Sequence, residues 1–240
     1  MLHHLANDSA GAAENMALDL LLLENYPDNA VARFRHYTWN EPAFTFGLSQ
    51  NWQQTWATTP AQCALIRRPT GGGVVSHLDD WTYTVIIPFA HRLCQAHATE
   101  SYKVIHQALT EALHRQNIPA ELVPCPGNNC ATDEPKPPAH KPGICFVAPE
   151  IFDVVRPCDG QKIAGAAQKR NRHGLLVQGS IAKAVTGTNT DWQKFELDFA
   201  TLLADILKCK TTAQPMPVFE KALFSETVAR FSSKAWNERH

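Results

Sequence analysis

The sequence predicts an α+β fold with a mixed, largely antiparallel sheet packed with helices. Short strand-like runs are grouped and separated by turns, and the helical patterns lie mostly outside those groups. No internal repeat is present, which argues against a solenoid. A length of 240 residues suits one large domain or two small ones, and a hydrophobic content of 44% allows a sizeable core.

The elements follow in a clear order along the first half of the chain. A helix is expected over residues 13–25, where Met16, Leu20 and Leu23 fall on one face. Runs rich in β-branched and aromatic residues, bounded by turn signals, come next. A second amphipathic helix turns Ile105 and Leu109 inward. The expected strands are 31–37, 44–48, 63–67 and 81–87, and the second helix is 99–116.

A proline-rich segment, residues 124–143, separates the two halves. It contains six prolines, whose missing amide donors exclude a helix or a central strand. Long loops of this kind are linkers, disordered segments or functional lids. The strand pattern resumes directly afterwards and neither half looks complete, so we expect a single domain over residues 1–240 with a lid at about 124–143. The later strands are expected at 151–155, 161–168 and 174–182, and the closing helices at 191–207 and 218–231.

Charge and cysteine content limit the class of protein. The chain carries 22 Lys and Arg against 23 Asp and Glu, a net charge of -1, which is unlike a general nucleic-acid binder. Apolar stretches are too short to span a bilayer, and the N-terminus lacks the basic start and apolar run of a signal peptide. Seven cysteines, an odd number, favour free thiols in a reducing compartment. We therefore expect a cytoplasmic protein that binds neither nucleic acid nor membrane.

Three consecutive glycines, residues 71–73, follow the pair Arg67 and Arg68 in the run RRPTGGGVVSH. The triplet fits neither the phosphate-binding P-loop nor the dinucleotide fingerprint. A flexible turn is one interpretation. A ligand site is the other, because glycine lets a ligand approach the backbone closely and arginines bind carboxylates, phosphates or an acidic protein face. His77, at the end of the run, is a candidate base.

A second run, KIAGAAQ, begins at Lys162 and continues through small residues. An exposed lysine at the start of a strand is one interpretation. A working lysine is the other, because a buried ammonium is costly unless it is paired, and the small residues leave volume for a long, thin ligand. Cys145 precedes Lys162 by 17 residues (162 − 145) and follows the proline-rich loop. Cys145 can be interpreted either as a buried, inert thiol or as a nucleophile.

Cys125, Cys130, His140 and Cys145 lie close together in sequence and raise the question of a metal site. The spacing of the first two does not match the usual zinc pair. We expect unrelated loop thiols and no metal.

These two runs together resemble the biotin/lipoate protein ligase and transferase superfamily. RRPTGGGVVSH is similar to its RRxxGGGxVxH motif, and KIAGAAQ is similar to its K-I-x-G-S-A motif. The upstream runs ENMALDLLLL and FRHYTWNEPAFTFGLSQN resemble the first helix and following strand pair of the family. The resemblance extends from about Glu14 to Ile181 and implies the class II biotin synthetase and lipoate ligase-like catalytic domain.

Within that superfamily the chain looks closest to the cysteine-dependent octanoyltransferases and the lipoate-protein ligase A family. The resemblance to the transferases implies transfer of octanoyl or lipoyl from an acyl carrier protein thioester, through a cysteine acyl-enzyme, to a lysine of a lipoyl domain or glycine cleavage H-type carrier protein, without a cofactor. The expected catalytic residues are Cys145 and Lys162, and the expected substrate-binding residues are Arg67, Arg68, Gly71, Gly72, Gly73, His77, Gly165, Ala166 and Ala167.

Two alternatives stay open. An ATP-dependent lipoate-protein ligase would need ATP and Mg and would form an acyl-AMP. The 59 residues after Ile181 (240 − 181) look too few for the additional domain of many ligases. A catalytically inactive relative that binds acyl carriers is the other alternative, because Ala166 and Gln178 stand where the family motif has Ser and many relatives show His.

Overall fold

The computed structural model describes residues 1–125 and 149–239 of the chain. Nearly all of the expected lid, and the candidate nucleophile Cys145, lie outside the described residues. Among the helices of the described part, none combines the length and apolar character that a membrane span needs.

Cys125 is disulfide-bonded, so the expectation of free thiols is wrong for that residue. The described cysteines with free thiols are Cys63, Cys94, Cys158 and Cys209.

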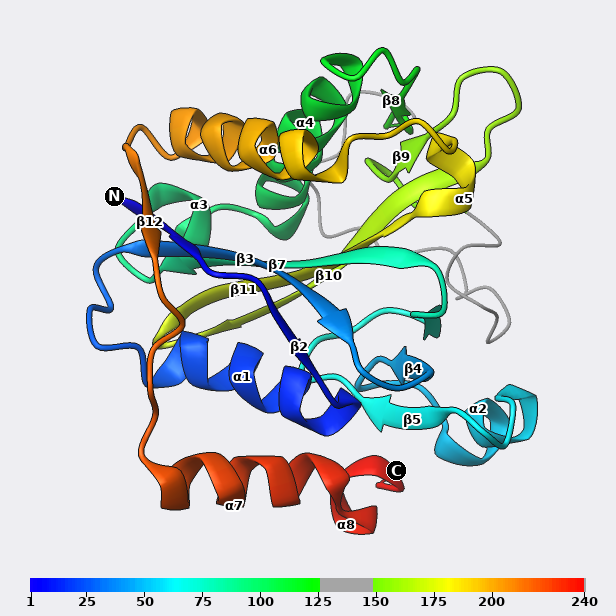
Figure 1. Ribbon diagram of the computed structural model, residues 1–240, viewed down its shortest axis with the longest axis vertical. Helices are drawn as coiled ribbons and strands as arrows, with labels where there is room; N and C mark the ends of the chain where they lie inside the picture. The colour runs from blue at the N-terminus through cyan, green and yellow to red at the C-terminus, as the bar shows by residue number, and fades with distance from the viewer. Residues whose placement is uncertain (126–148, 240) are drawn as a thin grey trace.

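A nine-stranded sheet runs through the middle of the molecule (Figure 1). Its strands are β1 (Leu2–Leu5), β2 (Asp8–Ala10), β3 (Ala32–Trp39), β7 (Asp80–Pro88), β8 (Glu121–Leu122), β9 (Val154–Val155), β10 (Lys162–Asn171), β11 (Gly174–Ala182) and β12 (Thr211–Gln214). Their order is β12-β1-β3-β7-β11-β10-β9-β8, with β2 pairing with β3. The pairs from β3 to β8 are antiparallel, and those joining β12, β1, β2 and β3 are parallel. The predicted mixed, largely antiparallel sheet is therefore confirmed.

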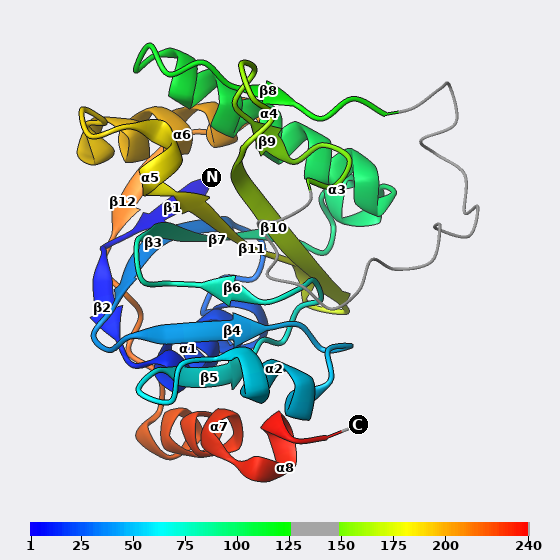
Figure 2. The same cartoon turned by 90° about the vertical axis from the view of Figure 1, so that its right-hand side faces the viewer.

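A small second sheet lies beneath the first, beside the first helix (Figure 2). It consists of β4 (Ala43–Phe46), β5 (Ala64–Arg67) and β6 (Val75–Ser76), in the order β5-β4-β6. The glycine triplet lies in the connection from β5 to β6. Gly72 of this connection lines a cavity together with residues of both sheets. The helices are α1 (Ala12–Glu24), α2 (Trp52–Thr58), α3 (Arg92–Gln95), α4 (Ala98–His114), α5 (Lys183–Thr186), α6 (Trp192–Ile206), α7 (Lys221–Ser232) and α8 (Lys234–Asn237).

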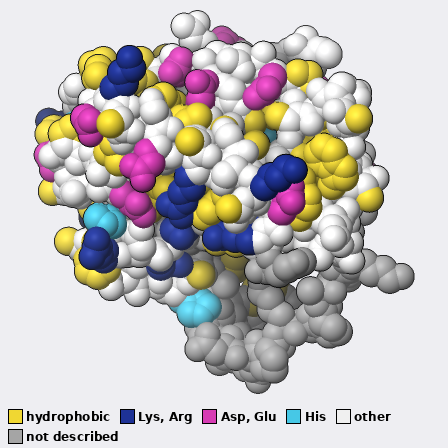
Figure 3. All heavy atoms as spheres, turned by 90° about the horizontal axis from the view of Figure 1, so that it is seen from below, with side chains coloured by type: hydrophobic (Ala, Val, Ile, Leu, Met, Phe, Trp, Pro, Cys, Tyr) yellow, Lys and Arg dark blue, Asp and Glu magenta, His cyan; other side chains and the backbone are white. Residues whose placement is uncertain are grey.

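Helices cover both faces of the large sheet. On one face α4 and α6 bury the main core, where Phe199 packs edge-on against Phe34 and Tyr83 with ring centroids 5.4 and 5.3 Å apart. On the other face lies α1, and α7 packs behind it, so that Met16 of α1 shares a core cluster with Phe231. Seen from the α7 side, Lys and Arg side chains gather toward the middle of the surface and Asp and Glu lie above them (Figure 3).

The helices expected at 13–25, 99–116, 191–207 and 218–231 correspond to α1, α4, α6 and α7. The strands β1, β2, β6, β8 and β12 were not expected. Their residues carry little period-2 pattern, and β1 is held as a strand by parallel pairing with β3 and β12, which are far away along the chain.

Candidate active site

A cavity with about 460 Å³ of space, its open mouth included, lies between the two sheets. Exposure falls across its lining: Gly72 is exposed and residues 165–167 are partly exposed, whereas Met16, Tyr37 and Thr45 are at most 1% exposed. The mouth therefore lies between the glycine triplet and β10, and the inner end lies under α1. The lining residues are Met16, Tyr37, Trp39, Thr45, Arg68, Gly72, Val75, His77, Thr82, Lys162, Gly165, Ala166, Ala167, Gln178, Gly179 and Ser180.

Arg68 shapes the glycine triplet from behind. Its Nη2 atom donates to the carbonyl oxygens of Gly71 and Gly73, at 2.7 and 2.9 Å, and its Nη1 atom donates to Thr45 Oγ1 at 2.9 Å. Gly72 adopts φ +86°, which side chains rarely tolerate, and a Cβ atom there would lie 3.5 Å from that of Ala167 on β10. The triplet is thus a fixed wall of the mouth opposite β10.

Lys162 begins β10 and is 5% exposed. Its Nζ atom lies 2.7 Å from Asp153 Oδ2, and the Asp153 side chain is fully buried. The pairing of β10 with β9 shifts register between Lys162 and Ala164. Gly165 provides the space, since a Cβ atom there would lie 2.6 Å from Lys162 Nζ. The ammonium is therefore paired, buried and presented at the cavity wall.

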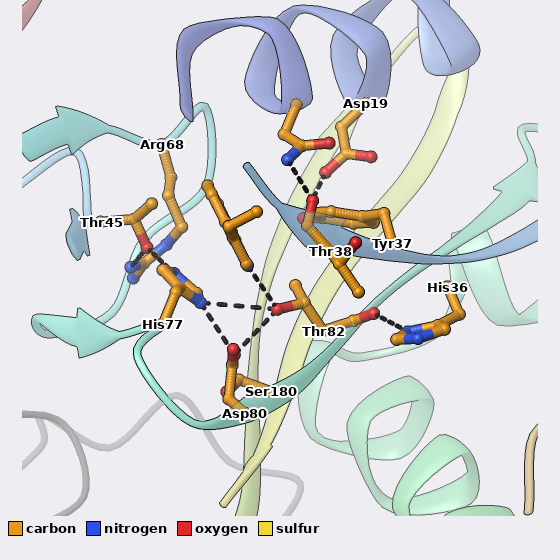
Figure 4. Close-up of polar contacts among 12 residues, drawn as sticks. Asp19, His36, Tyr37, Thr38, Thr45, Arg68, His77, Asp80, Thr82 and Ser180 are labelled. Carbon is orange, nitrogen blue, oxygen red and sulfur yellow. Dashed lines mark hydrogen bonds and ion pairs between the residues drawn. The ribbon is translucent and has the colours of Figure 1, made fainter. Parts of the chain in front are cut away.

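His77 belongs to a buried polar chain rather than to an open base position (Figure 4). Thr45 Oγ1, which accepts from Arg68, also lies within hydrogen-bond distance of His77 Nε2, at 2.8 Å. The Nδ1 atom of His77 then donates to Asp80 Oδ2, also at 2.8 Å, and the ring stacks on Trp39 at 4.0 Å. With both ring nitrogens engaged, His77 holds the cavity wall in place.

The Asp80 carboxylate ends this chain. Burial alone raises its pKa, but the charge and hydrogen bond of His77 and the hydroxyl donors Ser180 and Thr82 outweigh burial, and the net pKa is lowered. The carboxylate therefore stays charged at neutral pH and fixes the orientation of the His77 ring.

Gln178 joins the floor of the cavity to a second buried network. Its Oε1 atom accepts from Thr70 at 2.7 Å, and its Nε2 atom donates to Asp19 Oδ2 at 2.7 Å. Asp19 also pairs with Arg35 at 3.1 Å, and Tyr37 donates to it at 3.1 Å. Gln178 is thus an integral part of the cavity floor.

Arg67 lies elsewhere. Its guanidinium donates to the main-chain oxygens of Asn237 and Arg239 near the C-terminus, and to those of Leu48 and Gln50. In return, Asn237 Oδ1 accepts from the Arg67 amide at 2.7 Å. The residue that the sequence placed beside the substrate therefore anchors α8 against β5, on the far side of the strand from the cavity.

Replacing Arg67 with alanine is therefore expected to affect stability more than chemistry. The buried network loses its donor, and we expect the free energy of unfolding to fall by about 2–4 kcal/mol, measured by urea denaturation. Asn237→Ala should give a smaller loss, and the double variant should be less than additive because both side chains serve one contact. A fully additive pair would show that the two residues act independently.

Of the expected site residues, Arg68, Gly72, His77, Lys162, Gly165, Ala166 and Ala167 line the cavity. Gly71 and Gly73 contribute carbonyl oxygens to Arg68, Arg67 is turned away, and Cys145 lies outside the described residues. Sequence reasoning missed Asp153 and Thr45. One available signal was the acidic residue in the run IFDVV, because a carboxylate among apolar residues needs a partner.

Comparison with known proteins places these features in a family. The family described as "Lipoyl protein ligase A/B catalytic domain" matches residues 11–198. Octanoyltransferase LipM of Halalkalibacterium halodurans is 34% identical over 176 residues, covering 70% of this chain and 61% of that protein. Octanoyltransferase LipM of Bacillus subtilis (strain 168) is 32% identical over 177 residues, covering 72% and 62%. The chain thus spans about three fifths of the length of these relatives.

Solved structures share the fold. A lipoate-protein ligase A bound with ATP superimposes with a TM-score of 0.71 at 15% identity, covering 99% of this chain and 97% of the other. A bi-partite lipoate protein ligase from Thermoplasma acidophilum gives a TM-score of 0.68 at 16% identity, covering 99% and 95%. At these identities the likeness concerns the fold alone.

Proposed function

The chain belongs to the lipoyl protein ligase A/B catalytic domain family, and from this premise we propose that it is an octanoyltransferase. It takes octanoyl from the thioester of an acyl carrier protein and passes it to a lysine of a lipoyl domain or glycine cleavage H-type carrier protein. The observation that carries the proposal is the buried Lys162 ammonium, 2.7 Å from Asp153, at the wall of a cavity bordered by glycine and alanine.

The cavity suits a thin apolar chain. The small residues 165–167 on one side and Gly72 on the other keep side chains out of its mouth, and Met16 and Trp39 provide apolar surface further in. Burial of an alkyl chain contributes about 0.8 kcal/mol per methylene group, so an eight-carbon chain gains several kcal/mol. This free energy favours binding of the acyl chain in the cavity.

In the first step the thiolate of Cys145 attacks the thioester carbonyl. The bond from the acyl carbon to the carrier sulfur breaks, and the carrier thiolate takes up a proton as it leaves. The Lys162 ammonium stabilises the negative charge that develops on the carbonyl oxygen. Only the thiolate form of Cys145 is reactive, and a nearby cation increases its population.

In the second step the neutral amine of the acceptor lysine attacks the acyl-enzyme. The amide bond forms, the carbon–sulfur bond to Cys145 breaks, and the amine proton passes to the released sulfur. No nucleotide is required, because both steps start from an activated thioester.

Intact-mass spectrometry with octanoyl-acyl carrier protein tests the proposal. Wild-type protein should gain the mass of one octanoyl group, Cys145→Ala should gain none, and addition of a lipoyl domain should discharge the adduct. The same adduct on Cys145→Ala would contradict the covalent route. AMP release from octanoate and ATP, without an adduct, would instead favour the ligase. Carrier binding without turnover of either donor would favour the inactive relative.

A further inference from the structure

The hydroxyl group of Tyr102, on α4, lies between two parts of the candidate site. It donates to Asp153 Oδ1 at 2.5 Å and accepts the main-chain N–H of Ala166 at 3.0 Å. Asp153 in turn holds the Lys162 ammonium through its other oxygen, which also accepts from the Glu150 amide at 2.6 Å. One oxygen atom therefore ties together α4, the carboxylate and the strand that lines the cavity.

The position of Ala166 at the edge of β10 explains why a side chain, and not a neighbouring strand, accepts the hydrogen bond of its main-chain N–H. Among the described residues, β9 pairs with β10 only at Lys162 and Ala164. Beyond that point this edge of β10 has no neighbouring strand in the described part of the chain, and the Ala166 amide would lack an acceptor. Tyr102 supplies the acceptor next to Gly165, the residue that makes room for the Lys162 side chain.

We propose that Tyr102 is a positioning residue for acyl transfer: its hydroxyl fixes the Asp153 carboxylate, and the carboxylate holds the Lys162 ammonium at the cavity wall. This inference rests on the proposed octanoyltransferase function. Tyr102 touches neither the acyl group nor Lys162 in this chain of contacts, so it acts through Asp153.

The other titratable groups near Asp153 do not replace the hydrogen bond that Tyr102 donates to it. Besides Lys162 and Tyr102, the charge of Asp153 acts on the titratable groups of His106 on α4 and Tyr83 on β7, and neither makes a hydrogen bond to Asp153 in the described part of the chain. Burial lowers the pKa of His106 to about 4, so its ring is neutral, and its Nδ1 atom is engaged by the Phe152 carbonyl oxygen at 2.7 Å. Burial, followed by the charge of Asp153, raises the pKa of Tyr102 well above its usual value. The hydroxyl thus keeps its proton and remains a donor throughout the working pH range.

Tyr102→Phe tests the inference, with Tyr83→Phe as the matched control. The Tyr83 ring is also buried, but its hydroxyl has no hydrogen-bond partner in the described part of the structure. For Tyr102→Phe we expect kcat for octanoyl transfer to fall about 10-fold, the equivalent of one hydrogen bond to a charged group, with KM unchanged. Tyr83→Phe should change neither.

The outcomes separate this inference from the proposed function. Absence of transfer by the wild type would refute the proposed function, whereas transfer by Tyr102→Phe with wild-type kcat would refute the role of Tyr102. A crystal structure of Tyr102→Phe gives a readout independent of activity. We expect Asp153 Oδ2 and Lys162 Nζ to separate beyond the ~4 Å of an ion pair. Retention of the 2.7 Å contact would overturn the inference.

Discussion

Lys162→Met is expected to reduce kcat/KM for octanoyl transfer by about 10²–10³, the loss typical of a removed transition-state donor. The methionine keeps a flexible side chain of comparable length but has no charge. It therefore cannot stabilise the carbonyl oxygen in the proposed mechanism. Single-turnover acylation, followed by mass spectrometry, measures the first step directly, and that step should show the full loss.

The same substitution leaves the buried Asp153 carboxylate without its cation. Removal of one partner of a buried ion pair typically lowers the free energy of unfolding by about 3–5 kcal/mol. That loss is a large part of the total stability of a domain, about 5–15 kcal/mol. Low activity of Lys162→Met alone is therefore ambiguous between lost chemistry and lost folding.

The double variant Lys162→Met with Asp153→Asn resolves the ambiguity. It removes both charges, so stability should recover in part while acyl transfer remains low. Restored activity in the double variant would show that the ammonium has only a structural role. Wild-type activity in the single variant would remove the lysine from the mechanism altogether.

Local sequence patterns were enough to predict the central strands of the large sheet but not the strands at its edges. The strands β7, β10 and β11 carry their own signal, because each is long, rich in β-branched or small residues and bounded by turns. The short run Leu2–Leu5 becomes a strand only through its neighbours β3 and β12. Pairings at such sequence separations cannot be derived from one chain without its structure.

In the candidate site too, local motifs predicted some residues but not their partners from distant parts of the sequence. The motifs indicated Lys162 and the glycine triplet, but Tyr102, which is linked to Lys162 through Asp153, lies 60 residues (162 − 102) from Lys162 in sequence, and no spacing rule connects them. Arg67 and Arg68 looked equivalent in the motif. Adjacent residues on an extended chain point to opposite sides, so that only one of the two could face the ligand, and this rule was available from the sequence. Arg68 is the one that faces the cavity.

Gly47 is a further residue that the sequence did not indicate. A Cβ atom at this position would lie 2.1 Å from the carbonyl oxygen of Gly72 and 2.5 Å from the carbonyl carbon of Gly71. The amide of Leu48 donates to Thr70 O at 3.0 Å, so the two segments are held together at this distance. The triplet can form the cavity wall only because Gly47, which lies directly behind it, has no side chain.

Gly47→Ala is therefore expected to displace the triplet, because main-chain atoms cannot move aside as a flexible side chain does. We expect the free energy of unfolding to fall by about 1–3 kcal/mol, as for other overpacked sites, and kcat/KM for octanoyl transfer to fall at least ~10-fold, since small displacements of positioning groups have large effects on rate. Thermal denaturation and steady-state kinetics on the same preparation measure both.

Gly71→Ala provides the contrast, because a Cβ atom there meets nothing within 4 Å. Its stability should stay within ~0.5 kcal/mol of wild type, as for an ordinary surface change, although it lies in the conspicuous triplet and Gly47 does not. Equal losses for the two variants would mean that the triplet needs glycine for its own flexibility. A loss confined to Gly47→Ala would mean that close packing of the triplet against Gly47, the residue after β4, sets the position of the cavity wall.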